Sequence, residues 1–211
     1  MKYNYKVVLT AYVAFSLMAC SPGKTSEEYI SIAKANVKAS KNVDAIIVLK
    51  NAIKADLNNV EARMLLGALY LDMGDAESGE KELRRALELS GDLDNILPKL
   101  LKALNLQNKS EESLSLIDKY EKFTPEILLY QALSYIRLNK KDKARVAIAL
   151  ANDISTESIY SQLGEAYLQA DSSDADGALE NINKILATDP NMTEALLLKG
   201  QLHFARKEFS N

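Results

Sequence analysis

The sequence predicts an all-α solenoid of stacked antiparallel helix pairs, with about five and a half pairs. A pattern of small residues recurs about every 34 residues, and repeats of that length indicate stacked helical units. The 211 residues include only 8 Gly and 4 Pro, which disfavours an all-β fold with many tight turns. Hydrophobic residues make up 47% and charged residues 26%, the balance of an ordered chain with a buried core.

Residues 1–19 have the features of a lipoprotein signal peptide. Lys2 and Lys6 precede an uncharged apolar run over residues 7–17, which is too short to span a bilayer but suits the apolar region of a secretory signal. The run ends in Leu17-Met18-Ala19-Cys20, which resembles the bacterial lipobox, where the Cys receives a diacylglyceryl group and becomes the first residue. The alternative is a buried or incidental Cys. We expect lipidation at Cys20.

A lipid on Cys20 predicts a protein tethered to a membrane by residues 20–25. The residue directly after the Cys is Ser21 and not Asp. By resemblance to lipoproteins of Gram-negative bacteria, this favours the outer membrane, with the chain facing the periplasm.

The rest of the chain repeats itself. Leu66-Gly67-Ala68-Leu69-Tyr70 and Leu163-Gly164-Glu165-Ala166-Tyr167 share the pattern Leu-Gly-x-x-Tyr. The small residue of this pattern serves as a marker of each unit, and its spacings are 34, 34, 31, 32 and 36 residues. The markers are Ala33, Gly67, Leu101, Ala132, Gly164 and Gly200. The predicted units are 26–59, 60–93, 94–124, 125–156, 157–192 and an incomplete unit 193–211.

A second small residue follows each marker by twelve positions, at Ala45, Gly79, Ser113 and Ala144. We expect the two small residues to let the two helices of a unit approach closely. In the fifth unit Ala178 comes fourteen residues after the marker, which we assign to a two-residue insertion within residues 171–176.

Helix ends can be placed from capping and turn residues. Thr25 with Glu28, and Asn191 with Glu194, have the spacing of a capping box. Thr124 followed by Pro125 fits an N-cap and a first helical residue. We expect the turns inside the helix pairs at Gly74-Asp75, Asn108-Lys109 and Asn139-Lys140.

A 34-residue unit with Leu-Gly-x-x-Tyr, a later Ala and a closing Pro, as at Pro190, resembles the tetratricopeptide repeat. The resemblance covers about residues 26–211, and Leu101 departs from it because Gly or Ala is usual there. It implies a right-handed α-solenoid whose first helices line a concave face that binds protein or peptide partners. The Lys and Asn clamp with which some members hold a peptide carboxylate is not recognisable.

Positions two, five, nine and twelve of each unit line that face in the family. They include Asn95, Pro98, Lys102 and Asn105 in the third unit, Glu126, Leu129, Leu133 and Ile136 in the fourth, and Ser158, Ser161, Glu165 and Leu168 in the fifth. We expect the fourth unit to expose the most apolar surface and to anchor the partner. The alternative is that these side chains pack on neighbouring helices. The candidate partner-binding residues are Met64, Leu71, Lys102, Leu129, Tyr130, Leu133, Ile136 and Arg137.

The composition disfavours other classes of function. One Cys and one His leave no Cys- or His-based metal site, and a net charge of −3 gives no reason to expect nucleic acid. We expect His203 to pack against the partner helix. Residues 171–177 resemble a calcium loop, but Ser172 and Asn183 stand where acidic ligands are needed. We therefore predict no catalytic residue, no metal, no cofactor and no enzymatic activity.

The stretch Asp44–Lys54, Asn58–Gly67 and Glu80–Leu89 is similar to the N-terminal repeats of the tetratricopeptide lipoproteins that accompany the PEP-CTERM/exosortase system. That resemblance implies a scaffold for extracellular polysaccharide export or surface-protein sorting. The alternatives are an assembly factor for a pilus, secretin or outer-membrane machine, or the targeting half of a longer enzyme. Because the helix after Thr193 is apolar almost all round, we expect the array to continue beyond Asn211.

Overall fold

The computed structural model describes residues 23–90 and 93–206, and all the regular elements in these residues are helices. Cys20 and the rest of the expected signal peptide lie outside the described residues. The eleven helices are α1 (Ser26–Lys38), α2 (Asn42–Ala55), α3 (Val60–Asp72), α4 (Ala76–Ser90), α5 (Leu93–Leu106), α6 (Ser110–Ile117), α7 (Pro125–Arg137), α8 (Lys141–Ile154), α9 (Ile159–Asp171), α10 (Ala175–Thr188) and α11 (Thr193–Ala205).

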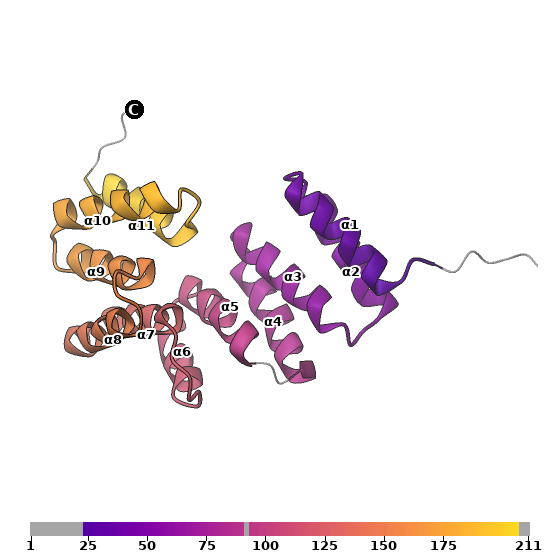
Figure 1. The fold of residues 1–211 in the computed structure, drawn as a ribbon, viewed down its shortest axis with the longest axis horizontal. Coiled ribbons are helices and arrows are strands. Elements are labelled where there is room, and N and C mark those ends of the chain that lie inside the picture. Colours follow the sequence, from indigo (N-terminus) through magenta and orange to yellow (C-terminus); the bar gives the residue numbers. More distant parts are fainter. Residues whose placement is uncertain (1–22, 91–92, 207–211) are drawn as a thin grey trace, which may run out of the picture.

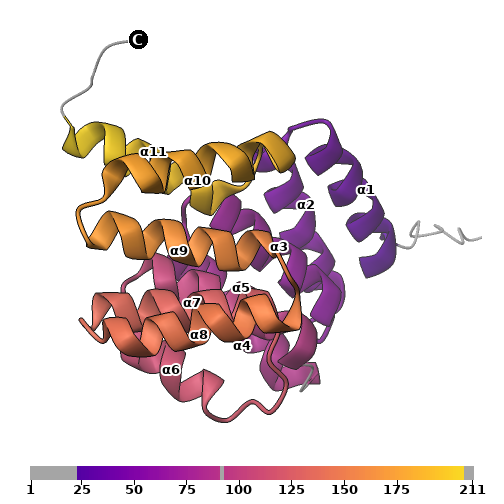
Figure 2. The same cartoon turned by 60° about the vertical axis from the view of Figure 1, so that its left-hand side comes forward.

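Consecutive helices form antiparallel pairs that stack along an arc (Figure 1), with the pair α1–α2 at one end and the pair α9–α10, followed by α11, at the other. The pair α7–α8, the helix α9 and the helices α10 and α11 lie as successive layers in both views (Figure 2). The largest buried cluster runs through these layers, from Leu97 to Leu202. The all-α solenoid predicted from the sequence is confirmed.

Every turn inside a pair has the same backbone conformation. The turn has three residues, and the second residue has a left-handed φ between 56° and 81°. The amide of the third residue donates to a carbonyl five residues earlier, for example from Asp75 to Tyr70 at 2.8 Å and from Lys140 to Tyr135 at 2.8 Å. This is the Schellman arrangement that ends a helix. The second residues of the turns are Ser40, Gly74, Asn108, Asn139 and Ser173, so the three predicted turns are confirmed.

Two of the three predicted N-caps are correct. Thr25 forms a capping box with Glu28, in which each side chain accepts a hydrogen bond from the other residue's amide, at 3.2 and 2.9 Å. The Thr124 side chain caps α7 by accepting from the Ile127 amide at 3.3 Å. The capping box predicted at Asn191 is wrong, because α11 begins one residue later, with Met192 at its N-cap and no side-chain cap.

The two small residues of a unit set the contact between its two helices. A methyl group on Gly67 would lie 2.7 Å from Leu83 Cγ, and one on Gly79 would lie 2.7 Å from Leu71 Cδ2. Ala33 and Ala45 occupy the same two places in the first pair, and both are buried. The close approach predicted for the small residues is therefore confirmed at Gly67 and Gly79.

The predicted alignment of the fifth unit with the other units is wrong. The turn after α9 has three residues, as in the other pairs, so no insertion lies within residues 171–176. Because α9 begins at Ile159, the residue in phase with Gly67 is Ala166, and Ala178 follows it by the usual twelve positions. Gly164, the predicted marker, instead faces α8, where a methyl group would lie 2.8 Å from Ile148 Cγ1. The helices in phase therefore place the fifth unit at 159–192.

The third pair departs from the others because Leu101 stands where they have a small residue. Leu101 is fully buried, and the buried hydroxyl of Ser113, its counterpart on α6, makes no hydrogen bond within the described residues. Helices α5 and α6 contact each other less than the helices of any other pair. Helix α6 has 8 residues, whereas the second helices of the other pairs have 14 or 15.

The same substitution at two glycines tests the role of close packing. Gly67→Ala should lower the free energy of unfolding by about 1–3 kcal/mol, because the new methyl group overlaps Leu83. Gly200→Ala should leave it unchanged or raise it by up to about 1 kcal/mol, because nothing lies within 4 Å and Ala favours a helix. Chemical denaturation of both variants checks this. Equal effects would contradict the packing argument.

Candidate functional site

The inner face of the C-terminal half is held together by Glu194, the second residue of α11. Its carboxylate accepts a hydrogen bond from the Tyr130 hydroxyl on α7 at 2.9 Å and forms an ion pair with Lys102 on α5 at 3.2 Å. Its main-chain carbonyl accepts from the Tyr167 hydroxyl on α9 at 3.3 Å. One residue thus ties together four first helices, and the array curls until α5 and α11 meet across its inner face.

Burial sets the ionisation of this network. Tyr130 is fully buried, and the loss of water together with the nearby Glu194 carboxylate raises the pKa of its hydroxyl well above the ordinary value. The same two causes raise the pKa of Tyr167 to about 12. Both tyrosines are therefore neutral hydrogen-bond donors at physiological pH.

A cavity of about 230 Å³ opens beside this network. Glu126, the second residue of α7, lies on its wall and makes no hydrogen bond or ion pair within the described ranges. Burial is the main cause that raises the pKa of this carboxyl, and the attraction of Lys99 and Lys102 does not offset it. The other polar lining residues are Lys102, Tyr130, Tyr160, Asp189, Asn191, Thr193 and Glu194.

This cavity can hold a hydrogen-bond donor or a cation. A half-buried carboxylate without a partner gains most from a charged donor, because the surroundings screen the attraction poorly. Tyr160 adds an aromatic ring, which also favours cations. A lysine, arginine or amide group of a peptide has the matching chemistry. We define the inner pocket as the cavity between Glu126 and Tyr160.

A second cavity lies on the inner face of the N-terminal half. It has a volume of about 240 Å³, an apolar floor between α1 and α3, and one Lys and one Asp in its lining. Lys34 is held by Glu61 at 2.6 Å. The lining residues are Ala33, Lys34, Val37, Leu49, Leu65, Ala68, Leu69 and Asp72.

Four of the residues predicted to bind a partner are core residues instead. The expectation that the fourth unit exposes the most apolar surface is wrong, because the curvature of the array brings α5, α9 and α11 over the inner side of α7. The exposed fractions are 3% for Leu71, 1% for Leu129, 2% for Tyr130 and 2% for Leu133. These four side chains instead pack on neighbouring helices, which was the alternative interpretation of the sequence.

The other four candidates keep part of their surface. Met64 and Ile136 are half-buried at the edges of two core clusters. Lys102 lines the inner pocket, and the Arg137 guanidinium donates to the Asn105 side-chain oxygen. Partner binding by these four residues stays a prediction.

The structure adds Tyr160 to the site, a residue that the sequence analysis missed. With the fifth unit in its correct phase, positions two and nine are Tyr160 and Tyr167, and not Ser158 and Glu165. Every turn inside a pair has three residues. Aligning the fifth unit by that constant turn length, and not by the Leu-Gly-x-x-Tyr match, places Tyr160 and Tyr167 at positions two and nine.

The acidic stretch 171–177 forms a helix turn and cap. Asp171 pairs with Lys141 at 2.6 Å, and Asp174 caps α10 by accepting from the Gly177 amide at 3.0 Å. His203 is half-buried on α11.

Within the described residues, no group of three or more His, Cys, Asp or Glu side chains is arranged to hold a metal ion. None of the described helices is long and apolar enough to cross a membrane.

Comparison with known proteins connects this fold to one repeat class. The family model of the tetratricopeptide repeat matches residues 31–94, which lie in the first three helix pairs. Curated protein sequences give no match. The matched segment is therefore a tetratricopeptide repeat segment by sequence, and the structural comparisons extend the likeness to the remaining pairs.

Solved tetratricopeptide repeat structures share the fold of most of the chain. A protein of Thermus thermophilus covers 85% of this chain and 98% of its own, with 17% identity and a TM-score of 0.62. A protein of Parabacteroides merdae covers 85% and 72%, with 19% identity and a TM-score of 0.58. YrrB, described as having an unusual peptide-binding site, covers 83% and 92%, with 15% identity and a TM-score of 0.55. The described helices form a tetratricopeptide-type solenoid.

The burial of Glu126 predicts a pH-dependent effect of one substitution. The folded protein raises the pKa of this carboxyl, so the charged form lowers the free energy of unfolding at a pH above the raised pKa. This loss of stability disappears at low pH, where the carboxyl is protonated in both the folded and the unfolded state. Glu126→Gln should therefore raise the melting temperature at pH 7, and the gain should vanish below about pH 4. Glu61→Gln, at the same position of α3 but ion-paired to Lys34, should show no such gain. Thermal unfolding at several pH values decides this.

Proposed function

We propose that the protein is a non-catalytic scaffold, held by a lipid in the bacterial cell envelope, that binds a protein partner in the inner pocket. The observation that carries the binding role is Glu126, a half-buried carboxylate without a partner on the wall of a cavity on the inner face. Interaction surfaces of repeat solenoids lie on such faces. A basic or hydrogen-bond-donating segment of the partner supplies what Glu126 lacks.

The lipobox-like Leu17-Met18-Ala19-Cys20 supports the membrane anchor. In this proposal residues 20–25 serve as a short tether to the first helix, which begins at Ser26. A lipidated Cys20 would hold the array close to the membrane surface, and Ser21 after the Cys favours the outer membrane.

The resemblance of the first repeats to lipoproteins of the PEP-CTERM/exosortase system supports a role in polysaccharide export or surface-protein sorting. Such a role needs a protein that holds partners at the envelope and does no chemistry of its own. A pilus or secretin assembly factor uses the same anchor and the same kind of surface, so the partner that is captured separates the two roles.

The anchor is tested at Cys20. Cys20→Ser should prevent lipidation, which labelling with a radioactive or clickable fatty acid measures. Cell fractionation should then find the protein in the soluble fraction or as the uncleaved precursor. Ser21→Asp is the matched control, because it keeps the lipid and should redirect the protein to the inner membrane. Fatty-acid labelling that persists in Cys20→Ser would contradict the anchor.

The partner site is tested by photo-crosslinking in intact cells. A photoreactive phenylalanine analogue at Tyr160 should capture a specific protein, because this ring lines the inner pocket. The analogue at Glu180, on the outer side of α10, is the control for chance proximity and should give no such product. Adding Glu126→Gln should reduce capture at Tyr160 by about tenfold if a cationic group binds the carboxylate. Equal capture from both positions would reject the inner pocket as the site.

A further inference from the structure

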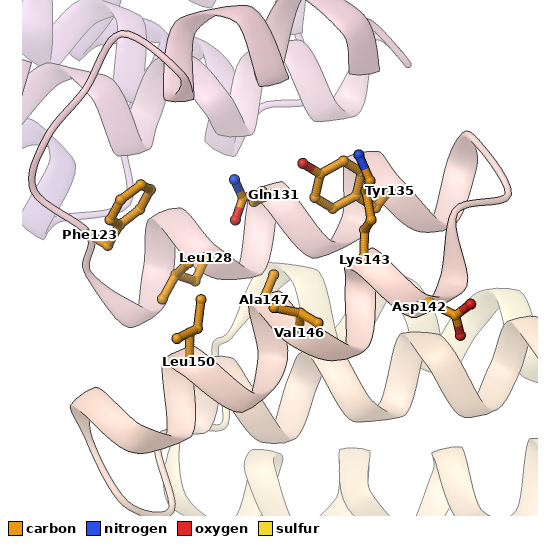
Figure 3. Close-up of a pocket in the computed structure, with 9 residues that line it drawn as sticks. All are labelled: Phe123, Leu128, Gln131, Tyr135, Asp142, Lys143, Val146, Ala147 and Leu150. Atoms are coloured by element: carbon orange, nitrogen blue, oxygen red, sulfur yellow. The ribbon is translucent and has the colours of Figure 1, made fainter.

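An apolar groove lies on the outside of the array, between α7 and α8 (Figure 3). It has a volume of about 430 Å³. Leu128, Gln131 and Tyr135 line it from α7, and Val146, Ala147 and Leu150 line it from α8. Phe123, in the segment before α7, closes one end and is 46% exposed.

One end of the groove lies beside the chain that follows a short helix. Helix α6 ends at Ile117, and the non-helical segment 118–124 joins it to α7. Phe123 belongs to this segment and lines the groove.

Two outward positions of α8 are apolar where α4 and α10 are charged, whereas α2 has Ile47 and Asn51 there. Val146 and Leu150 are 61% and 48% exposed. The same two positions hold Lys81 and Arg85 on α4, and Glu180 and Lys184 on α10. Charged residues at these positions suit a solvent-facing helix, so α8 has the surface of a helix that is covered.

The charges that flank this apolar surface are arranged symmetrically. Lys143 and Asp153 lie on the same side of α8 as Val146 and Leu150, because the four residues are spaced by three, four and three. Val146 and Leu150 stand two residues on either side of Ile148, and Lys143 and Asp153 stand five residues on either side. The Lys143 amine lies 5.6 Å from the Tyr135 ring, and Asp153 is exposed.

We propose that the groove is the interface of a homodimer, in which α8 of a second copy lies antiparallel to α8 about a two-fold axis near Ile148. That axis puts Val146 of each copy opposite Leu150 of the other, and each Lys143 opposite the other copy's Asp153. A two-fold interface uses the same patch twice, so it requires a surface that is complementary to itself. The reversed order of charges along α8 satisfies this requirement, and the apolar centre lies between them as in stable interfaces.

The test measures the mass of the whole lipid-anchored chain in detergent, by sedimentation and light scattering corrected for bound detergent. The wild type should show twice the protein mass of a single lipidated chain. Val146→Glu with Leu150→Glu should raise the dimer dissociation constant about tenfold or more, while circular dichroism shows unchanged helicity. Ile47→Glu, at the equivalent exposed position of α2 (54%), should leave the dimer intact.

Charge exchange then tests the antiparallel arrangement. Lys143→Glu and Asp153→Lys should each weaken the dimer, and the two changes combined should restore it, because they exchange the signs across the interface. A monomeric wild type at all concentrations would overturn the proposal. So would a Val146→Glu/Leu150→Glu variant that dimerises normally, a charge exchange that fails to rescue, or a dimer lost through Leu196→Glu with Leu197→Glu on the exposed face of α11.

Discussion

The close approach of the two helices in each pair is the constraint on which the rest of the structure depends. Gly67 with Gly79, and Ala33 with Ala45, let the helix axes come together, and a methyl group at either glycine would overlap a core side chain. Where Leu101 replaces the small residue, α6 contacts α5 less and ends early.

The curvature of the array decides which part of its inner face can bind. In the C-terminal half, Glu194 links α11 to α5, α7 and α9, and the side chains between them are buried. The inner pocket beside Glu126 stays accessible there. In the N-terminal half the cavity between α1 and α3 is apolar. The two halves therefore offer surfaces of different chemistry, one polar and one apolar.

The sequence predicted the features that depend on a few neighbouring residues. The capping box at Thr25 and the turns at Gly74, Asn108 and Asn139 follow from local backbone chemistry, and the structure has them where they were expected. The phase of the fifth unit was mistaken because Gly164 completes a Leu-Gly-x-x-Tyr match by chance, while the in-phase Ala166 lacks that context.

The accessible surface could not be predicted in the same way. Leu129 and Leu133 occupy positions that face the inside of a single unit, but distant helices cover them. How far a solenoid curls depends on small rotations between units, and no single unit encodes them. The early end of α6 had a sequence signal in the spacing of only 31 residues between Leu101 and Ala132, but the groove beside it became visible only in three dimensions.

The contacts of Glu194 also change how the chain should unfold. In most repeat proteins each unit touches only its neighbours, so stability is a sum of local terms and the ends can fray separately. Here the hydrogen bond from Tyr130 to Glu194 joins residues 64 positions apart, and one buried cluster runs from Leu97 to Leu202. Helices α5, α7, α9 and α11 consequently form a single cooperative block, so the loss of one end helix weakens the whole block. Helices α1 and α2 instead pack on α3 through a separate small cluster and are the part of the array most able to fray from its end.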